Sequence, residues 1–203
     1  GSTIHGEFRE LCTSKLKNIF FSEPPKDCLP ELFRQAGYQV AAYHGNDSRF
    51  YRRDSWYPRI GFEEIVDIKR LEKQKSSFCG GLWNGFCDLD LFTLVFSQGG
   101  GAMRRFDYIL TLNTHLPPEP MTKGVGTARD CVGKFPELVC VHLDNTLKVL
   151  NGLSSEISRR NNTIVIVAGD HAPPFLLEDD KKFFYLDRVP LYVITPNGPH
   201  QER

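Results

Sequence analysis

The hydrophobic pattern alternates short apolar runs with segments of helical spacing. The runs that predict strands cover residues 38–43, 62–66, 106–112, 164–168 and 188–194. The segments that predict helices cover residues 7–17, 29–36, 68–75, 88–96 and 135–160. Strands that alternate with helices are typical of an α/β fold with a mainly parallel sheet sandwiched by helices. No internal repeat interrupts the pattern, so we expect residues 1–203 to form a single domain.

The run Ile164–Ala168 is the clearest strand, and its five apolar residues predict burial on both faces of a sheet. It leads into Gly169-Asp170-His171, and Pro173-Pro174 prevents continuation. Open α/β sheets form their binding crevices at the carboxyl ends of the strands. A carboxylate oxygen beside an imidazole nitrogen is half of a ligand set for zinc or manganese. The alternative is an ordinary turn with an exposed His171.

A polar, aromatic and arginine-rich segment, residues 44–57, follows the strand at 38–43. An arginine presents a planar fork that matches phosphate, and aromatic faces can hold a small headgroup. The segment also fits a plain amphipathic helix with surface arginines. Asp47 and Asp54 interrupt the positive charge, so no long basic patch forms.

Two further candidates lie beside predicted elements. Thr3 precedes the first predicted helix, where a hydroxyl is either an N-cap or a nucleophile placed to attack a phosphate. His115 follows the strand at 106–112 and is a donor or an acid–base candidate, or else an exposed loop histidine.

The longest predicted helix, 135–160, has an apolar stripe that we expect to face inward: Leu138, Val141, Leu147, Leu150 and Leu153. We expect Asp144 and Asn145 in the middle of this helix to be solvated.

Composition narrows the class of protein. The chain is 40% hydrophobic and carries 25 basic and 25 acidic residues, which argues against disorder and against a nucleic-acid partner. No signal peptide or membrane-spanning run is present, and Gly1-Ser2 resembles a cloning remainder, so we expect an excised piece of a longer protein.

Six cysteines fall into three couples that are close in sequence, 12 with 28, 79 with 87, and 131 with 140. An even count in loop-rich surroundings suggests three disulfides and an oxidising compartment. The alternative is six reduced, mostly buried thiols in a cytosolic protein.

Taken together, these motifs resemble the lipoteichoic acid synthase-like branch of the alkaline phosphatase/sulfatase superfamily. Thr3-Ile-His-Gly-Glu-Phe8 is similar to its nucleophile segment, and residues 44–54 are similar to its headgroup-binding segment. Residues 111–117 resemble the segment that carries its substrate histidine. Gly169-Asp170-His171 matches its metal-binding pair, and residues 189–196 resemble the strand that follows.

The resemblance implies a mechanism and a set of site residues. One divalent ion, manganese or zinc, would be held by Thr3, Asp170 and His171, and Thr3 would form a phospho-threonine intermediate. The substrate-binding residues would be His44, Asn46, Tyr51, Arg53 and His115, with Tyr51 as an aromatic wall where the family often has Trp. The donor would be a phospholipid headgroup and the acceptor a glycan or lipid, with transfer of phosphoglycerol or phosphoethanolamine. A parent protein would be membrane-anchored, with this domain on the periplasmic or extracytoplasmic side.

This sequence departs from the family in one respect. The family places a further acidic metal ligand on a strand upstream of the threonine, and this segment is absent, so we expect a fold without its first strand. Glu7 lies too close along the helix to replace that ligand. The sulfatase maturation motif, C/S-x-P-x-R, is not matched by Cys12-Thr-Ser-Lys-Leu, which disfavours sulfate-ester hydrolysis. A phosphatase or phosphodiesterase, and a non-catalytic binding domain, stay as alternatives.

Overall fold

The computed structural model describes residues 3–12, 27–73, 78–79, 85–98, 103–115, 119–121, 124–126, 128–171, 182 and 188–196. Its α-helices are α1 (Thr3–Leu11), α2 (Leu29–Gln35), α3 (Arg53–Trp56), α4 (Ile68–Glu72), α5 (Asp88–Ser97) and α6 (Glu137–Ile157). Its strands are β1 (Gln39–His44), β2 (Glu64–Val66), β3 (Arg105–Leu110), β4 (Val165–Ala168) and β5 (Leu191–Ile194). Short 3-10 turns cover Phe50–Arg52, Pro58–Ile60 and Ala128–Cys131. The predicted alternation of strands and helices is confirmed.

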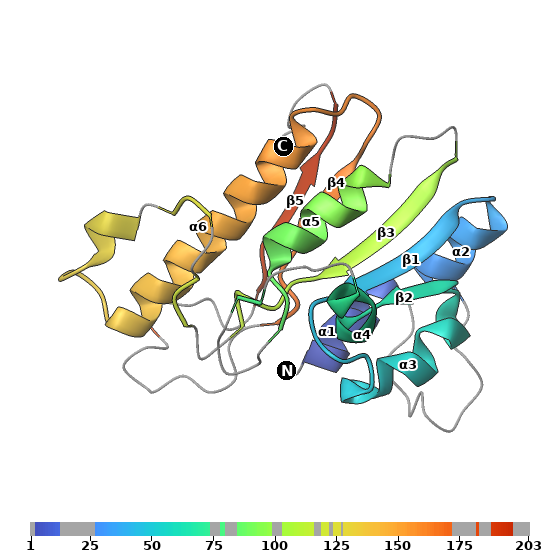
Figure 1. Cartoon of the computed structure of the whole chain (residues 1–203), viewed down its shortest axis with the longest axis horizontal. Helices are drawn as coiled ribbons and strands as arrows, with labels where there is room; N and C mark the ends of the chain where they lie inside the picture. Colours follow the sequence, from blue (N-terminus) through green and yellow to red (C-terminus); the bar gives the residue numbers. More distant parts are fainter. Residues whose placement is uncertain are drawn as a thin grey trace.

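A parallel three-stranded sheet in the order β2-β1-β3 forms the first half of the fold. Successive residues of β1 point to opposite faces. Val40 and Ala42 join an apolar cluster with α1 and α3, while Ala41 and Tyr43 join a second cluster with α4 and α5. Helices therefore cover both faces of this sheet, as Figure 1 shows, and the α/β prediction is confirmed.

The second sheet is an antiparallel pair, β4 with β5. Val165 and Val167 face inward onto a cluster that contains Val149 and Leu153 of α6. Ile164 and Ile166 point the other way and are 67% and 65% exposed. The prediction that this strand is buried on both faces is therefore wrong, because no described element covers its outer face.

The long helix α6 is shorter than predicted, and its inward side agrees with the predicted apolar stripe only in part, since Leu153 is buried as predicted. Its buried residues are Cys140, Asn145, Val149 and Leu153. Leu150, expected inside, is 37% exposed, and Asn145, expected in solvent, is fully buried. The apolar residues alone did not predict the inward side of α6, because the polar contacts of Asn145, described below, also determine how the helix is rotated.

The helix α1 begins at Thr3, four residues before the predicted start, so Thr3 is its first helical residue. Residues 13–17 of the predicted helix lie outside the described residues. The helix α2 ends as predicted, with Gly37 in the left-handed conformation (φ +79°) that glycine adopts without strain.

Three disulfides join the sequence-local couples Cys12–Cys28, Cys79–Cys87 and Cys131–Cys140. They close sequence separations of 16, 8 and 9 residues. The pairing agrees with the oxidised alternative raised from the sequence.

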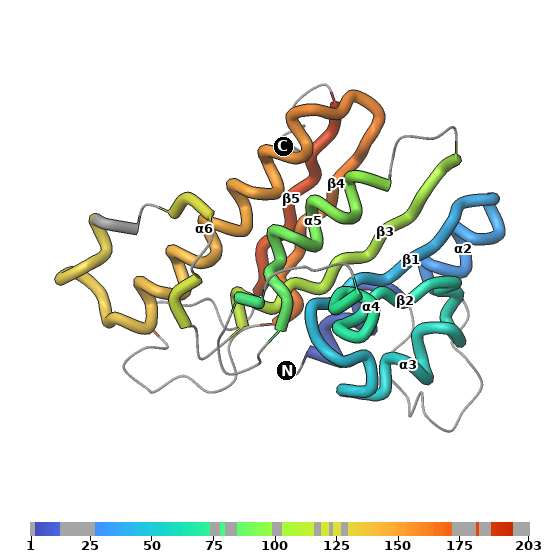
Figure 2. The backbone as a smooth tube through the Cα atoms, in the orientation of Figure 1, coloured from blue at the N-terminus to red at the C-terminus, as the bar shows by residue number. Residues whose placement is uncertain are grey.

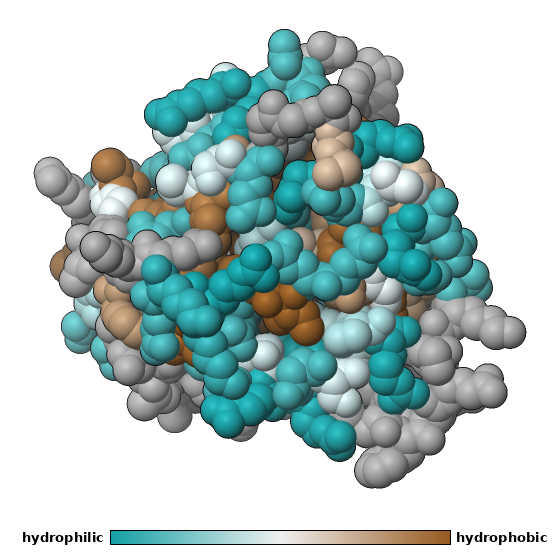
Figure 3. Space-filling model, turned by 45° about the vertical axis from the view of Figure 1, so that its right-hand side comes forward, coloured by the Kyte–Doolittle hydropathy of each residue, from teal (hydrophilic) through white to brown (hydrophobic). Residues whose placement is uncertain are grey.

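The face in Figure 3 is largely hydrophilic, with small apolar areas between polar side chains. Among the described helices, none is both long and apolar enough to cross a membrane.

Candidate active site

Thr3, the first residue of α1, lies beside His171, which follows β4. The hydroxyl Oγ1 of Thr3 lies 3.2 Å from Nε2 of His171, across 168 sequence positions. Oδ2 of Asp170 lies 3.3 Å from the same Nε2, and Oδ1 accepts the backbone N–H of His171 at 2.9 Å. Figure 2 shows the carboxyl end of β4 near the first helix, α1, beside the N-terminus, and Nη2 of Arg9 in α1 donates to the carbonyl oxygen of Asp170 at 2.8 Å. One hydroxyl, one carboxylate and one imidazole thus converge at the start of a helix.

His44, the last residue of β1, is buried and neutral. Its Nδ1 lies 3.0 Å from the carbonyl oxygen of Leu110, so Nδ1 carries the proton and Nε2 carries a lone pair. The pKa of His44 is lowered to about 3, mainly by burial and also by the nearby Arg53 guanidinium. His44 therefore presents an acceptor at Nε2 and adds no positive charge near neutral pH.

Arg53, the first residue of α3, is 2% exposed and paired with the fully buried Glu7 of α1. Its Nε lies 3.0 and 3.1 Å from the two carboxylate oxygens, and Nη2 lies 2.5 Å from one of them. Its Nη1 donates to the carbonyl oxygen of Phe50 at 3.3 Å. The predicted phosphate ligand thus commits most of its donors to a carboxylate inside the protein.

The segment between His44 and Arg53 is held in a fixed shape. Oγ of Ser48 donates to the buried Asp67 at 2.7 Å, and Asp67 also caps α4. Tyr51 and Arg52 have φ values of +56° and +54°, a left-handed conformation that costs energy in residues other than glycine. The Tyr51 ring is exposed and lies 5.4 Å from the Arg53 guanidinium carbon. Asn46 is half-buried, and its Oδ1 accepts the N–H of Asp47 at 2.6 Å.

His115 lies in the loop after β3, which is held from two helices. Asp88, the first residue of α5, accepts the backbone N–H groups of Leu112 and Asn113 at 2.8 Å each. Asn145 of α6 donates to the carbonyl oxygens of Asn113 and Glu119, and it accepts the N–H of Met121. The backbone N–H of His115 itself donates to Leu112 at 3.0 Å.

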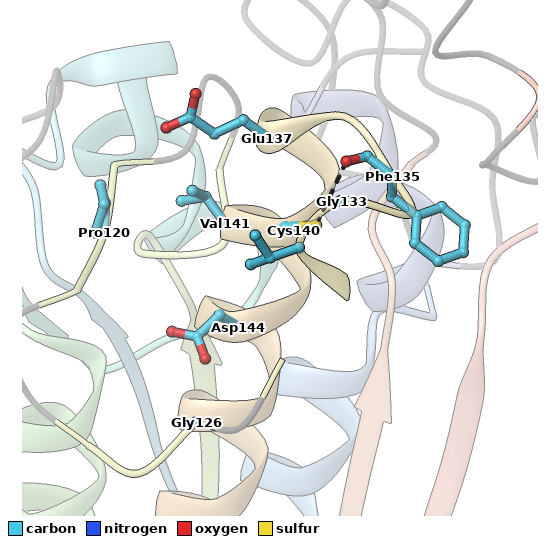
Figure 4. Close-up of a pocket in the computed structure, with 9 residues that line it drawn as sticks. Pro120, Gly126, Gly133, Phe135, Glu137, Cys140, Val141 and Asp144 are labelled. Carbon is cyan, nitrogen blue, oxygen red and sulfur yellow. Dashed lines mark hydrogen bonds between the residues drawn. The ribbon is translucent and has the colours of Figure 1, made fainter. Parts of the chain in front are cut away.

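A cavity of about 530 Å³ lies apart from these residues. Figure 4 shows Glu137, Val141 and Asp144 of α6 facing Pro120 across it. No predicted site residue is among the described residues that line this cavity.

The sulfatase family model matches residues 13–203 of the chain. The chain belongs to the sulfatase family. The matched range contains His44, Arg53, His115, Asp170 and His171, whereas Thr3 precedes it. A search of curated proteins found no match.

Solved structures agree with the fold of this sulfatase-family chain. The lipoteichoic acid synthase LtaP of Listeria monocytogenes matches at 18% identity and a TM-score of 0.70, over 99% of this chain and 54% of that one. A Vibrio parahaemolyticus protein of the alkaline phosphatase superfamily matches at 16% identity and a TM-score of 0.74, over 98% and 50%. The Streptococcus pyogenes phosphoglycerol transferase GacH, solved with sn-glycerol-1-phosphate, matches at 17% identity and a TM-score of 0.67, over 100% and 57%. The chain spans about half the length of these proteins.

Several residues that shape the candidate site of this sulfatase-family domain were missed from the sequence: Glu7, Tyr57, Asp88, Asn113 and Asn145. Asn145 had a visible signal, because it lies four positions before Val149 and therefore on the same helical side. An acidic residue in the first turn of a helix, such as Asp88, has an ordinary local explanation, and nothing local indicated its partners.

Proposed function

We propose that the longer protein transfers a phosphoglycerol or phosphoethanolamine group from a phospholipid headgroup to a glycan or lipid acceptor. The observation that carries this proposal is the contact of the Thr3 hydroxyl with His171 at the N-terminus of α1. The phosphoglycerol transferase GacH, solved with sn-glycerol-1-phosphate, supports the substrate class.

Thr3 would be the nucleophile and would carry the phosphoryl group as a phospho-threonine. Its position is suited to this role because the first N–H groups of a helix have no partner within it and attract anions. The α1 helix has nine residues, so its peptide dipoles also favour negative charge at this end.

The residues present fit a divalent ion, which would be manganese or zinc. Ligands at about 2.0–2.2 Å around a tetrahedral ion lie roughly 3.3–3.5 Å from one another. The separations of 3.2 Å from Thr3 Oγ1 to His171 Nε2, and 3.3 Å from that nitrogen to Asp170 Oδ2, are close to this spacing. When bound, the ion would lower the pKa of the hydroxyl and polarise the phosphate. No group of three or more His, Cys, Asp or Glu suited to a metal occurs among the described residues, so this set rests on the threonine oxygen.

The remaining predicted residues would bind the headgroup. His44 would orient the substrate by accepting a hydrogen bond at Nε2, because it is neutral there. Arg53 would supply positive charge, with Nη1 directed toward the Phe50 carbonyl at the strained turn. His115, Asn46 and the exposed ring of Tyr51 would complete the wall. The three disulfides support a periplasmic or extracytoplasmic location. The proposal also includes a membrane anchor in the longer protein.

Phosphate-ester turnover by the full-length protein with added manganese or zinc tests the proposal. Wild type is compared with Thr3→Ala and with Thr146→Ala, a matched change in α6 at a hydroxyl that donates to the carbonyl of His142 in its own helix. We expect turnover and a trapped phospho-threonine in wild type and in Thr146→Ala, and neither in Thr3→Ala.

The acceptor decides between closely related reactions. Transfer to a glycan or lipid supports the transferase, whereas release to water alone supports a phosphatase of the same fold. A folded wild-type protein without turnover under either metal would leave a binding domain and would overturn the proposal.

A further inference from the structure

The helix α1 carries Thr3, and the residues that hold this helix lie one turn further along it. Thr3 and Glu7 are four positions apart, so their side chains lie on the same side of the helix. The Glu7 carboxylate is fully buried and accepts hydrogen bonds from three directions: Nε and Nη2 of Arg53, and the hydroxyl of Tyr57 at 2.5 Å. Through Glu7, the helix that carries Thr3 is bonded to the segment that carries the headgroup-binding candidates.

The same helix also contacts the tip of β4. A Cβ atom at Gly6 would lie 2.4 Å from the carbonyl oxygen of Asp170, so only glycine permits this approach. Nη2 of Arg9 donates to that same oxygen at 2.8 Å. The position of α1 is therefore fixed between Arg53 on one side and Asp170 on the other.

Burying the Glu7–Arg53 ion pair costs desolvation free energy, so a contribution to stability does not by itself account for its presence. Removing two charges from water is expensive, and well-packed apolar residues of similar volume often stabilise a protein as much or more. An ion pair with three directional contacts does differ from apolar packing in one respect, since it accepts only one relative placement of its partners. Phe8 and Trp56 already supply apolar packing between α1 and α3 at a centroid distance of 6.2 Å.

The backbone conformation next to Arg53 supports the view that this ion pair fixes the placement of its partners. Tyr51 and Arg52 sit in the left-handed region, and such strain persists only where the surroundings hold it. The anchors on either side are Ser48, bound to Asp67, and Arg53, bound to Glu7.

We propose that Glu7 is a positioning residue. Through Arg53 and Tyr57 it fixes the rotation and height of α1, which keeps the Thr3 hydroxyl at His171 and keeps Arg53 at the strained turn. Its consequence for catalysis rests on the proposed function, whereas its effect on the placement of Thr3 does not.

The placement of Thr3 can be measured without any activity. All six cysteines are in disulfides, so Thr3→Cys provides a single thiol at a position that is 9% exposed. Alkylation of this thiol under native conditions reports how often α1 leaves its place. We expect Glu7→Gln to accelerate alkylation by about tenfold beyond any change that global unfolding predicts. Tyr57→Phe, which removes one contact of three, should have a smaller effect in the same direction and serves if Glu7→Gln fails to fold.

Asp107→Asn is the matched control, because Asp107 is paired with Arg105 at 2.8 Å within β3, away from α1. It should leave the alkylation rate at position 3 unchanged. The alkylation rates of Thr3→Cys alone, Thr3→Cys with Glu7→Gln and Thr3→Cys with Asp107→Asn are compared after correction for global stability. Equal rates in all three would overturn the positioning role.

A second measurement separates this inference from the proposed function. In the chain with Thr3 intact, Glu7→Gln should lower kcat at least several-fold with little change in KM, while Asp107→Asn changes neither. If wild type shows no turnover, the proposed function fails, and the alkylation result alone decides the role of Glu7.

Discussion

Asp88 and Asn113 hold each other through reciprocal hydrogen bonds. The N–H of Asp88 donates to Oδ1 of Asn113 at 2.8 Å, and the N–H of Asn113 donates to Oδ2 of Asp88 at 2.8 Å. The side chain of Asn113 thus caps α5 from another part of the chain, since the residue at the start of α5, Cys87, makes no side-chain cap. The start of α5 and the loop that carries His115 are consequently one structural unit.

Asp88→Ala should destabilise the protein by about 2–4 kcal/mol, because it leaves two backbone N–H groups without an acceptor. Asp88→Asn keeps one acceptor oxygen and should cost roughly half as much. Urea unfolding of the two variants and wild type provides the measurement. Equal stabilities for wild type and Asp88→Ala would show that the loop does not depend on this carboxylate.

Asn145→Ala should lower the free energy of unfolding by about 2–4 kcal/mol. The backbone groups of Asn113, Glu119 and Met121 would each lose their hydrogen bond with the Asn145 side chain. The neighbouring Asp144→Ala is the control. Asp144, whose side chain is 28% exposed, pairs with Lys148 at 2.9 Å within α6, and such a pair four positions apart on a helix is worth below about 1 kcal/mol. The two free energies of unfolding should therefore differ clearly, and similar values would contradict the buried role of Asn145.

Acidification should destabilise the fold through His44. The imidazole has a pKa of about 3 in the folded state, against an ordinary value of 6.5 in the unfolded chain. As the pH falls below 6.5, the imidazole is protonated in the unfolded state but stays neutral in the folded state. The free energy of unfolding therefore decreases progressively down to about pH 3. The total is roughly 3–5 kcal/mol. His44→Gln should show a correspondingly shallower loss in urea unfolding over this range, and parallel curves would refute the assignment.

Glu10 should act in the opposite direction. The pKa of Glu10 is raised from 4.5 to about 7, mainly by burial and also by the charge of Asp170, while the hydrogen bond with Tyr108 acts in the lowering direction. The folded state then holds a proton that the unfolded state releases, so this stability is present below pH 4.5 and is lost as the pH rises through about 7. Glu10→Gln should remove this loss in unfolding curves recorded across that interval. A variant whose stability falls as steeply as that of wild type would disprove it.

The sequence was informative wherever local periodicity decides the structure. Four elements lie within two residues of their predicted positions: the strands at 39–44 and 105–110 and the helices at 29–35 and 88–97. Their apolar residues recur with the period of a strand or a helix, about 2 or 3.6 residues, and this pattern is visible in the local sequence. The start of α1 at Thr3 was missed, since the contacts of Gly6 and Arg9 with the distant Asp170 help to hold this helix.

Long-range polar pairs were beyond the sequence. Several arginines are candidates for a carboxylate partner, and nothing near Glu7 indicates that the partner is Arg53, 46 positions away. The exposure of Ile166 was missed for a related reason, because an apolar run does not say how many of its faces are covered. The motif order did place Thr3 with His171, although the roles of these residues remain predictions.

The separation of 168 positions between Thr3 and His171 also has a consequence for biosynthesis. At roughly 5–20 residues per second, a ribosome reaches His171 about 8–34 s after it has made Thr3. No disulfide links α1 to the segment after β4, since each disulfide joins cysteines at most 16 positions apart. The parallel sheet β2-β1-β3 is complete by residue 110, so a nascent chain can contain this whole sheet before the tip of β4 exists. A chain that stalls in between has its nucleophile candidate and no His171 for it to contact, so the Thr3–His171 contact can form only after translation has passed residue 171.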